Sequence, residues 1–403
     1  MTGRARRTVV GAGVVPMFLV GVLCVFRPAV LSSLERTVYD TVVRAADHRP
    51  PSGSVVIVDV DERSLATVGQ WPWRRDVMGR LISNLRTLDA SVIALDIIFA
   101  EPDRLSDPAL DPDAVLAASL GGGRVVLGYG LTFESTQNAT AQCVPHPWGV
   151  SVVEPANLGT DQPFFEATSA VCNLPQLTAA TDTSGFLNAA PDSDGILRRV
   201  PLLAMYGGRM YPSLALAAVS SKTGARDPVL RVTNANAAVL SVGDQNVPLD
   251  GKGNMLVRFR GAKGTFAYLS AVDVLQGTTR PDAVRGKVVL VGTTALGTRE
   301  VVATPLDTLF TGVEVQATVV DNLLQQDAYR RPSHAVAIET VVALGLSGLV
   351  LCVVWQFGLL WSALVSAVLL GLLWGTTVSL LSNAGLFVSP LFPMLGVATG
   401  PRA

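Results

Sequence analysis

The chain has 403 residues, of which 49% are hydrophobic and only 16% are charged. An average soluble domain carries about 25% charged residues, so this composition indicates a protein that is partly embedded in a membrane. The formal net charge of −1 gives the chain no basic excess, and we therefore expect no nucleic-acid partner. A chain of this length can form one large domain with membrane spans or two modest domains.

The first predicted element is a membrane span near the N-terminus. The run Thr8–Phe26 has no charged residue and is long enough to cross a hydrocarbon core of about 30 Å as a helix. Arg4, Arg6 and Arg7 precede it and should remain on the cytoplasmic side. A cleaved signal peptide has a similar pattern, but no Ala-x-Ala site follows the run. We therefore interpret residues 1–26 as a basic cytoplasmic start and a transmembrane helix in a lipid bilayer.

Two further spans are predicted near the C-terminus, at Ala335–Phe357 and Leu359–Leu381, and each is long enough to cross the bilayer. The next apolar run, Leu386–Gly400, is short and contains prolines, so it is either a shortened last span or a span cut by the chain end. Residues 335–403 are thus expected to form two to three transmembrane helices. Glu339 lies near the start of the first of them, and we interpret it as an outer-edge residue and not as a transport site.

This arrangement of spans predicts a multi-pass protein of the inner (plasma) membrane with residues 27–334 outside the cytoplasm. The external segment contains Cys143 and Cys172, and an oxidising compartment favours a disulfide between them. Two separate buried thiols are the alternative, because sequence does not show whether the two Cα atoms approach closely enough. A lone pair of cysteines does not predict a metal site.

The external segment is predicted to form one α/β domain with a mixed, largely parallel sheet. Short apolar runs without polar alternation are typical of strands buried on both faces of a parallel sheet. Such runs occur at Val55–Val58, Val92–Ile98, Val125–Leu127 and Val288–Val291. An amphipathic helix between the first two runs completes a βαβ unit, and a second helix is predicted at Val313–Leu324. Shorter strand-like pieces between these elements suggest antiparallel additions.

Acidic residues follow the first two predicted strands. Asp59, Asp61 and Glu62 lie at the end of the first strand, and Asp96 and Glu101 lie in and after the second. Ligands of open α/β sheets bind at the carboxyl ends of the strands, so these residues are candidates for a cation or polar-ligand site. The structural alternative is that Asp61 caps a helix and that hydrogen bonds hold the loops around Trp71 and Trp73.

A second motif is the aromatic block Trp71, Pro72, Trp73 and Arg74. Its exposed rings could form a recognition patch for a ligand or a protein. The structural alternative is a turn set by the proline, with tryptophans that are buried in the core.

A third motif surrounds a turn that contains Asp192, Asp194 and Gly195 and is followed by Arg198. Arg198 could bind an anion from solution. It could instead pair with Asp192 or Asp194 across the turn, which would make the motif structural.

No pattern in the sequence predicts catalysis. The chain has neither a Walker-type phosphate loop nor a Gly-x-Ser-x-Gly elbow, and kinase and cyclase motifs are also missing. Its histidines, His48, His146 and His334, lack the spacing of metal ligands. We therefore expect no enzyme activity, no catalytic residue, no metal and no cofactor.

Several blocks of the sequence together resemble one family. They are Val58–Leu65, Trp71–Arg75, Ile93–Pro102, Pro191–Pro201, Gly286–Gly292 and Gly312–Val315. In these blocks the chain resembles the type-two CHASE domain, a cyclase- and histidine-kinase-associated sensory extracellular domain of bacteria. Members often carry Ile-His-Ala-Asn after the last block, whereas Val315, Gln316, Ala317 and Thr318 stand here.

The resemblance implies a sensory domain that leads through membrane spans into a cytoplasmic output, such as a nucleotide cyclase, a diguanylate cyclase or a kinase. It also implies a homodimer, because relatives control dimeric outputs. Here only Pro401, Arg402 and Ala403 follow the last apolar run, so we expect the output to be a partner or to be missing from this sequence.

The sequence is therefore consistent with two functions. The first is a transmembrane receptor in which an unknown extracytoplasmic ligand or protein shifts the α/β domain and thereby controls a cytoplasmic effector. The second is a membrane-anchored binding or scaffold subunit of a cell-envelope complex, without signalling.

Overall fold

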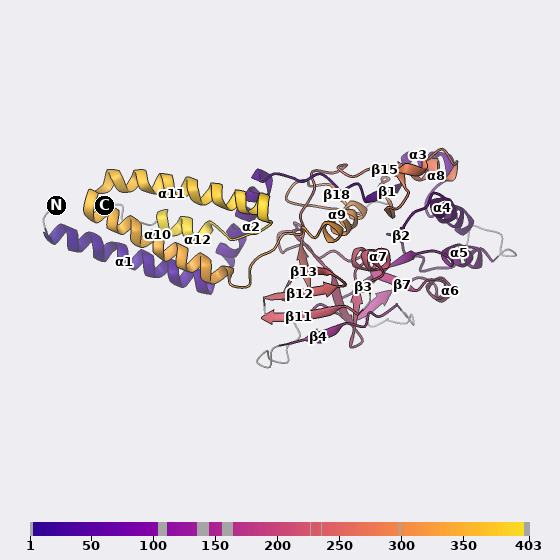
Figure 1. Cartoon of the computed structure of the whole chain (residues 1–403), viewed down its shortest axis with the longest axis horizontal. Coiled ribbons are helices and arrows are strands. Elements are labelled where there is room, and N and C mark those ends of the chain that lie inside the picture. Colours follow the sequence, from indigo (N-terminus) through magenta and orange to yellow (C-terminus); the bar gives the residue numbers. More distant parts are fainter. Residues whose placement is uncertain are drawn as a thin grey trace. The chain divides into compact units, whose positions relative to one another are not determined.

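The structure, a computed structural model, describes residues 3–103, 111–134, 145–154, 164–225, 227–234, 236–297 and 300–398. The chain forms two compact units, and many of their elements are labelled in Figure 1. One unit, Arg49–Ala328, is an α/β domain, and the other combines Met1–His48 with Tyr329–Ala403 and is helical. The α/β domain is shorter than the predicted range 27–334 because residues 29–45 form a helix that belongs to the helical unit.

The α/β domain is built on a seven-stranded sheet with the order β15-β1-β16-β2-β3-β6, in which β7 also pairs with β3. All pairs are parallel except that of β3 with β6, which confirms the predicted mixed, largely parallel sheet. The strands are β1 (Val55–Val60), β2 (Val92–Leu95), β3 (Val125–Thr132), β6 (Ser169–Val171), β7 (Thr183–Phe186), β15 (Tyr268–Ser270) and β16 (Val288–Thr293). Strand β2 ends before the predicted Ile98, because the chain leaves the sheet after the amide of Asp96 donates to the Val291 carbonyl at 2.8 Å.

The strands are apolar throughout because helices cover both faces of the sheet. In β1, Val55 and Ile57 belong to the core on one face, whereas Val56, Val58 and Val60 belong to the core on the other. Residues of α7 and α9 fill the first core, and residues of α4, α5, α6 and α8 fill the second. These helices are α4 (Arg75–Thr87), α5 (Pro112–Leu120), α6 (Pro175–Ala179), α7 (Leu214–Thr223), α8 (Ala271–Leu275) and α9 (Gly312–Gln325).

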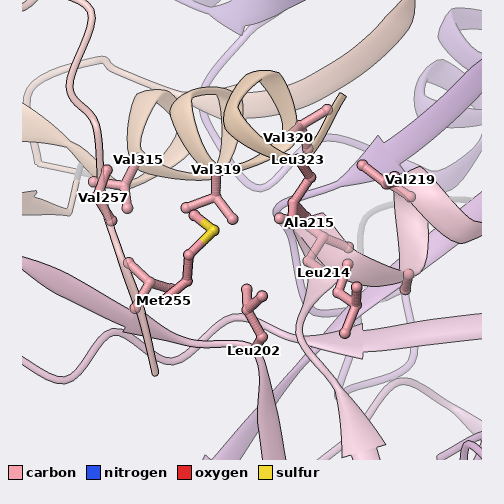
Figure 2. Close-up of a cluster of buried hydrophobic side chains, with 14 of the residues drawn as sticks. Leu202, Leu214, Ala215, Val219, Met255, Val257, Val315, Val319, Val320 and Leu323 are labelled. Atoms are coloured by element: carbon pink, nitrogen blue, oxygen red, sulfur yellow. The ribbon is translucent and has the colours of Figure 1, made fainter. Parts of the chain in front are cut away.

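Helix α9 lies at the centre of the first core. Figure 2 shows its apolar side chains directed toward α7 and toward a neighbouring strand segment. The labelled side chains are Val315, Val319, Val320 and Leu323 from α9, with Leu214, Ala215 and Val219 from α7 and Leu202, Met255 and Val257 from the remaining core. The predicted helix Val313–Leu324 is thus confirmed, with nearly the same bounds.

A buried carboxylate fixes the first turn of α9 to the segment that precedes β15. Glu314 is fully buried and accepts hydrogen bonds from the amides of Gly264 and Thr265, each at 3.0 Å, and from the Tyr268 hydroxyl at 2.9 Å. Burial of a charged group is tolerated only where such donors replace water. Glu314 is therefore a structural residue, and it determines where the first turn of α9 lies.

Smaller sheets surround the central one. A four-stranded sheet has the order β13-β12-β11-β4, with antiparallel pairs among its last three strands in sequence, as expected. Its strands are β4 (Ser151–Val153), β11 (Val229–Asn234), β12 (Ala237–Val242) and β13 (Gln245–Asp250). The other short elements are α3 (Glu62–Val68), β5 (Glu166–Ala167), β8 (Arg199–Pro201), β9 (Leu203–Tyr206), β10 (Arg209–Pro212), β14 (Asn254–Leu256), β17 (Val301–Val302) and β18 (Phe310–Thr311).

The helical unit contains α1 (Gly3–Phe26), α2 (Ala29–Ala45), α10 (Ala335–Phe357), α11 (Leu359–Ser379) and α12 (Leu391–Ala398). Two helices among the described residues, Ala335–Phe357 and Leu360–Ala384, are long and apolar enough to cross a membrane. Within α1, the segment Val15–Phe26 meets α2 at a bend of 82°. The apolar run after Leu386 forms only the eight residues of α12 within the described part, which is shorter than a span needs.

Ion pairs neutralise the acidic residue of α10. Glu339 is fully buried, and its carboxylate accepts from the Arg331 guanidinium at 2.9 Å, from Arg27 and from the Ser389 amide at 2.8 Å. Both arginines also pair with Glu35, at 2.9 Å for Arg27 and 2.7 Å for Arg331. Because each carboxylate has two cationic partners, the charges of this group compensate one another.

Candidate functional site

An open cleft of about 940 Å³ lies at the carboxyl ends of the central strands. Its walls come from the segment Asp96–Asp103 after β2, from Gly130 of β3, from residues 187–189 after β7 and from Thr293 at the end of β16. The first turn of α9 closes one side. Open α/β sheets bind their ligands in this position, because the loops that follow parallel strands diverge there.

The aromatic motif forms another wall of the cleft. Trp71, Pro72 and Trp73 all line it, and the peptide bond between Trp71 and Pro72 is cis. Trp73 is buried and its indole donates to the Gly69 carbonyl at 2.8 Å, whereas Trp71 is half-buried. The two alternatives for this motif therefore apply to different residues, since Trp73 is structural and Trp71 is accessible to a ligand. Arg74 does not line the cleft, and its guanidinium pairs with Asp76 at 3.0 Å.

Arg75, which belongs to a family block but was given no role from the sequence, supports this wall. The side chain is buried, and its Nε atom donates to Asp113 at 2.8 Å while a terminal nitrogen donates to the Glu101 carbonyl oxygen at 2.6 Å. The guanidinium also lies 4.6 Å from the centre of the Phe99 ring. Arg75 thus fixes the loop after β2 to α5, and its place next to the aromatic motif was the available signal.

Asp96 is the acidic candidate that faces the cleft without a partner. The structure gives its carboxylate no hydrogen bond and no ion pair among the described residues, although it lines the cleft together with Glu300. Burial, reinforced by the negative charge of Glu300, raises the pKa of Asp96 from 3.8 to about 7. A carboxylate in this state gains strongly from any cation or hydrogen-bond donor that enters the cleft.

The other acidic candidates do not join Asp96. Asp59 accepts from the Thr294 amide at 2.9 Å and from its hydroxyl at 2.5 Å, and burial raises the pKa of Asp59 to about 6. Asp61 caps α3 by accepting from the Ser64 amide at 2.8 Å, as the structural alternative predicts. Glu62 accepts from the Leu296 amide at 3.0 Å.

The predicted acidic group is consequently divided between two roles. Asp59, Asp61 and Glu62 hold loops and do not line the cleft, whereas Asp96 and Glu101 line it. Although burial opposes ionisation of Asp61, hydrogen bonds from Ser64 and Ser270 keep its pKa below the usual value. Among the described residues, no group of three or more His, Cys, Asp or Glu side chains is arranged to hold a metal ion.

The turn motif is structural, as one of its two interpretations predicts. Arg198 is buried and pairs with Asp192 at 2.8 Å and with Asp194 at 2.8 Å. Gly195 lies between them with a φ of 79°, a conformation that glycine adopts without strain. With both acidic partners in contact, Arg198 has no need of an anion from solution.

Gln316 is a further residue of the cleft that the sequence analysis did not assign to a site. It is 4% exposed, and its amide nitrogen donates to the Leu187 carbonyl at 3.3 Å. Its Oε1 atom is buried and has no hydrogen-bond partner within the described part of the chain. The departure of residues 315–318 from the common family pattern was the signal that could have identified it.

Of the two external cysteines, the structure describes Cys172. Cys172 is disulfide-bonded, and Cys24 and Cys352 are free. Cys143, the predicted partner of Cys172, lies outside the described residues, so their pairing stays a prediction.

Comparison with known proteins agrees with the resemblance seen in the sequence. No curated protein and no solved structure matches the chain. The family described as "CHASE2 domain" matches residues 15–360, which is most of the chain and includes every wall of the cleft. This protein therefore belongs to the CHASE2 domain family, whose members carry an extracellular sensory domain of signalling proteins.

Proposed function

We propose that this protein is a transmembrane signal receptor in which the α/β domain is extracytoplasmic, receives a stimulus in its cleft and controls a cytoplasmic output. The output is a nucleotide cyclase, a diguanylate cyclase or a kinase, supplied by a partner or by another part of the polypeptide. Membership of a sensory-domain family and the presence of helices able to span a membrane support this function. Control of a dimeric output by a homodimer is part of the proposal.

The observation that carries the proposal is the position of α9 in the chain. Its first turn supplies Gly312, Val313 and Gln316 to the wall of the cleft. After its last turn, residues 326–334 lead directly into α10, which is one of the helices able to span a membrane. A helix of 14 residues is about 21 Å long, so one continuous element extends from the cleft to the outgoing connection.

The second half of α9 is linked to both connections of the domain. Arg260 is buried, and its Nε atom donates to Asp321 of α9 at 2.7 Å, while its terminal nitrogens donate to Asp327 at 2.7 and 2.8 Å. Asp321 also accepts from the Ser52 amide at 3.2 Å, just before β1. The incoming segment, the outgoing segment and α9 therefore share one buried ionic cluster, and a shift of α9 would alter all three.

Two changes to the full-length protein in its native cells test this function. Deletion of residues 49–328 should change the level of a cyclic nucleotide, a cyclic dinucleotide or a phosphoprotein, because it removes the sensory domain. Arg260→Met should change the same response, and Arg260→Lys should change it less because one charged contact can persist. Arg280→Met is the matched control, since Arg280 is 82% exposed and pairs with Asp282, two residues further along the chain.

The readouts are quantitative mass spectrometry of nucleotides and phosphopeptides, with limited proteolysis to verify that the point variants are folded. A deletion that leaves every one of these responses unchanged would refute the receptor function. Stable, stimulus-independent association with other envelope proteins would then favour the scaffold alternative.

A further inference from the structure

The chemistry of the cleft restricts the class of ligand that it can bind. Several side-chain oxygens in its lining have no hydrogen-bond partner among the described residues: those of the Asp96 and Glu300 carboxylates and Oε1 of Gln316. Among the described residues that line the cleft, Arg75 is the sole cation, and its guanidinium is already paired with Asp113. A ligand that satisfies these oxygens supplies hydrogen-bond donors, and a positive charge on it is favoured by the two carboxylates.

Gln316 gives evidence for a ligand that does not depend on the acidic residues. The Leu187 carbonyl can only accept a hydrogen bond, so the amide nitrogen of Gln316 must face it, and Oε1 is the atom left without a partner. A buried acceptor without a donor costs about 1–3 kcal/mol. Gln316 lines the cleft, so a small rotation of its side chain would bring Oε1 to a donor on a ligand and remove this cost.

The size and the lining of the cleft argue against a bare metal ion. A volume of about 940 Å³ is in the range of small-molecule pockets, which is about 300–1,000 Å³. The described residues include no cluster of three potential metal ligands. Apolar groups from Trp71, Phe99 and Val313 also face the cleft, and they suit the hydrocarbon part of an organic molecule.

We infer that the cleft binds a small organic amine in its protonated form. Asp96 and Glu300 hold the ammonium group, Oε1 of Gln316 accepts from a further N–H or O–H donor, and Trp71 contacts the hydrocarbon part. This inference rests on the proposed function in taking the same cleft as the sensory site, but it concerns binding alone.

The charge state of Asp96 agrees with this class of ligand. With its pKa near 7, Asp96 is partly neutral at neutral pH when the cleft is empty. Glu300, Glu101 and Asp103 are the other acids in the lining, and Arg75 is the paired cation. An ammonium group stabilises the ionised carboxylate, so affinity should rise between about pH 6 and pH 8 as Asp96 loses its proton.

Isothermal titration calorimetry of the full chain in lipid nanodiscs tests the inference, with empty nanodiscs subtracted. The probes are phenethylamine, butylamine and putrescine, with 2-phenylethanol as a neutral analogue, phenylacetate as an anionic analogue, and Ca²⁺ and Mg²⁺ as metal ions. At least one amine should bind, and it should bind more tightly than its neutral and anionic analogues.

Variants then assign the contacts. Asp96→Asn should weaken amine binding roughly tenfold or more, because it removes a charge-assisted hydrogen bond, and Gln316→Leu should weaken it roughly two- to tenfold. Asp282→Asn is the control, since Asp282 is an exposed carboxylate outside the cleft, and it should leave binding unchanged.

Three outcomes would overturn the inference: no amine binds at millimolar concentration, the anionic or neutral analogue binds as well as the amine, or a metal ion binds in place of the amine. Its failure is distinguishable from failure of the proposed function. Asp96-dependent binding of an amine without any change in cytoplasmic output leaves the inference intact and contradicts the receptor function. If instead the output depends on the α/β domain but no amine binds, the receptor function stands and the inference is contradicted.

Discussion

Replacement of Asp96 by asparagine should stabilise the α/β domain at alkaline pH. The carboxylate has no hydrogen bond or ion pair among the described residues, and Glu300 adds repulsion, so its ionised form is poorly accommodated in the folded state. Asparagine has nearly the same shape without the charge. Asp96→Asn therefore removes an electrostatic cost and breaks no described contact of the side chain.

The sign and size of the effect follow from the pKa of Asp96, which is about 7 in the folded domain and 3.8 in the reference state. The folded state holds the proton of Asp96 more tightly than the unfolded state does. The free energy of unfolding is therefore highest below about pH 4, where both states are protonated, and it falls as pH rises to about 7. A difference of one pKa unit is worth about 1.4 kcal/mol, so the cost above pH 7 approaches roughly 4 kcal/mol. Solvent in the cleft screens part of it, and we expect Asp96→Asn to stabilise by about 2 kcal/mol at pH 8.

Pulse proteolysis in urea measures this difference on the full chain in nanodiscs, at several values between pH 5 and pH 8. The gain from Asp96→Asn should be largest at pH 8 and should decrease steadily toward pH 5. Asp282→Asn serves as the exposed control and should show no such dependence. A variant that is equally or less stable than the wild type at pH 8, or whose effect is independent of pH, would refute the account of Asp96.

Three other predictions concern stability and the division of roles around the cleft. Glu314→Gln should destabilise the domain by about 2–4 kcal/mol in urea titrations, because it removes the charge to which buried donors are directed. An unchanged midpoint of the urea unfolding curve would contradict this. Trp73→Ala should lower the free energy of unfolding by about 3–5 kcal/mol, because the side chain is buried. Trp71→Ala should retain most of the stability and weaken amine binding, since Trp71 is half-buried. Equal losses of stability in the two variants would contradict this division. Gly185→Ala should destabilise markedly, because its new Cβ would lie 2.6 Å from the backbone of α7, and Gly149→Ala, with nothing within 4 Å, should be neutral by the same assay.

The sequence alone determined those features that depend on local pattern. The apolar runs at β1, β2, β3 and β16 identified buried parallel strands, because alternate residues of such strands meet apolar helices on both faces. The capping role of Asp61 and the pairing of Arg198 with Asp192 and Asp194 were also among its predictions. For Asp61 and for Arg198 the partners lie within a few residues, so spacing along the chain is sufficient to bring them together.

The tertiary structure decided which polar residues share a site. Sequence placed Asp59 and Asp96 together at the ends of neighbouring runs, but β16 lies between β1 and β2 in the sheet, and Thr294 after β16 engages Asp59. Strand order is set by packing across the whole domain, and it cannot be deduced from the order of the strands along the chain.

The same reason explains the residues that were missed. Arg75 and Gln316 reach the cleft from α4 and α9, two helices that are far apart in sequence and pack on opposite faces of the sheet. Likewise, Ala29–Ala45 follows the first apolar run without any pattern that assigns it to one unit, and only its packing places it in the helical unit. Local chemistry thus determined the elements and their caps, while long-range packing determined the cleft, because a cleft is formed by residues that only the folded sheet brings together.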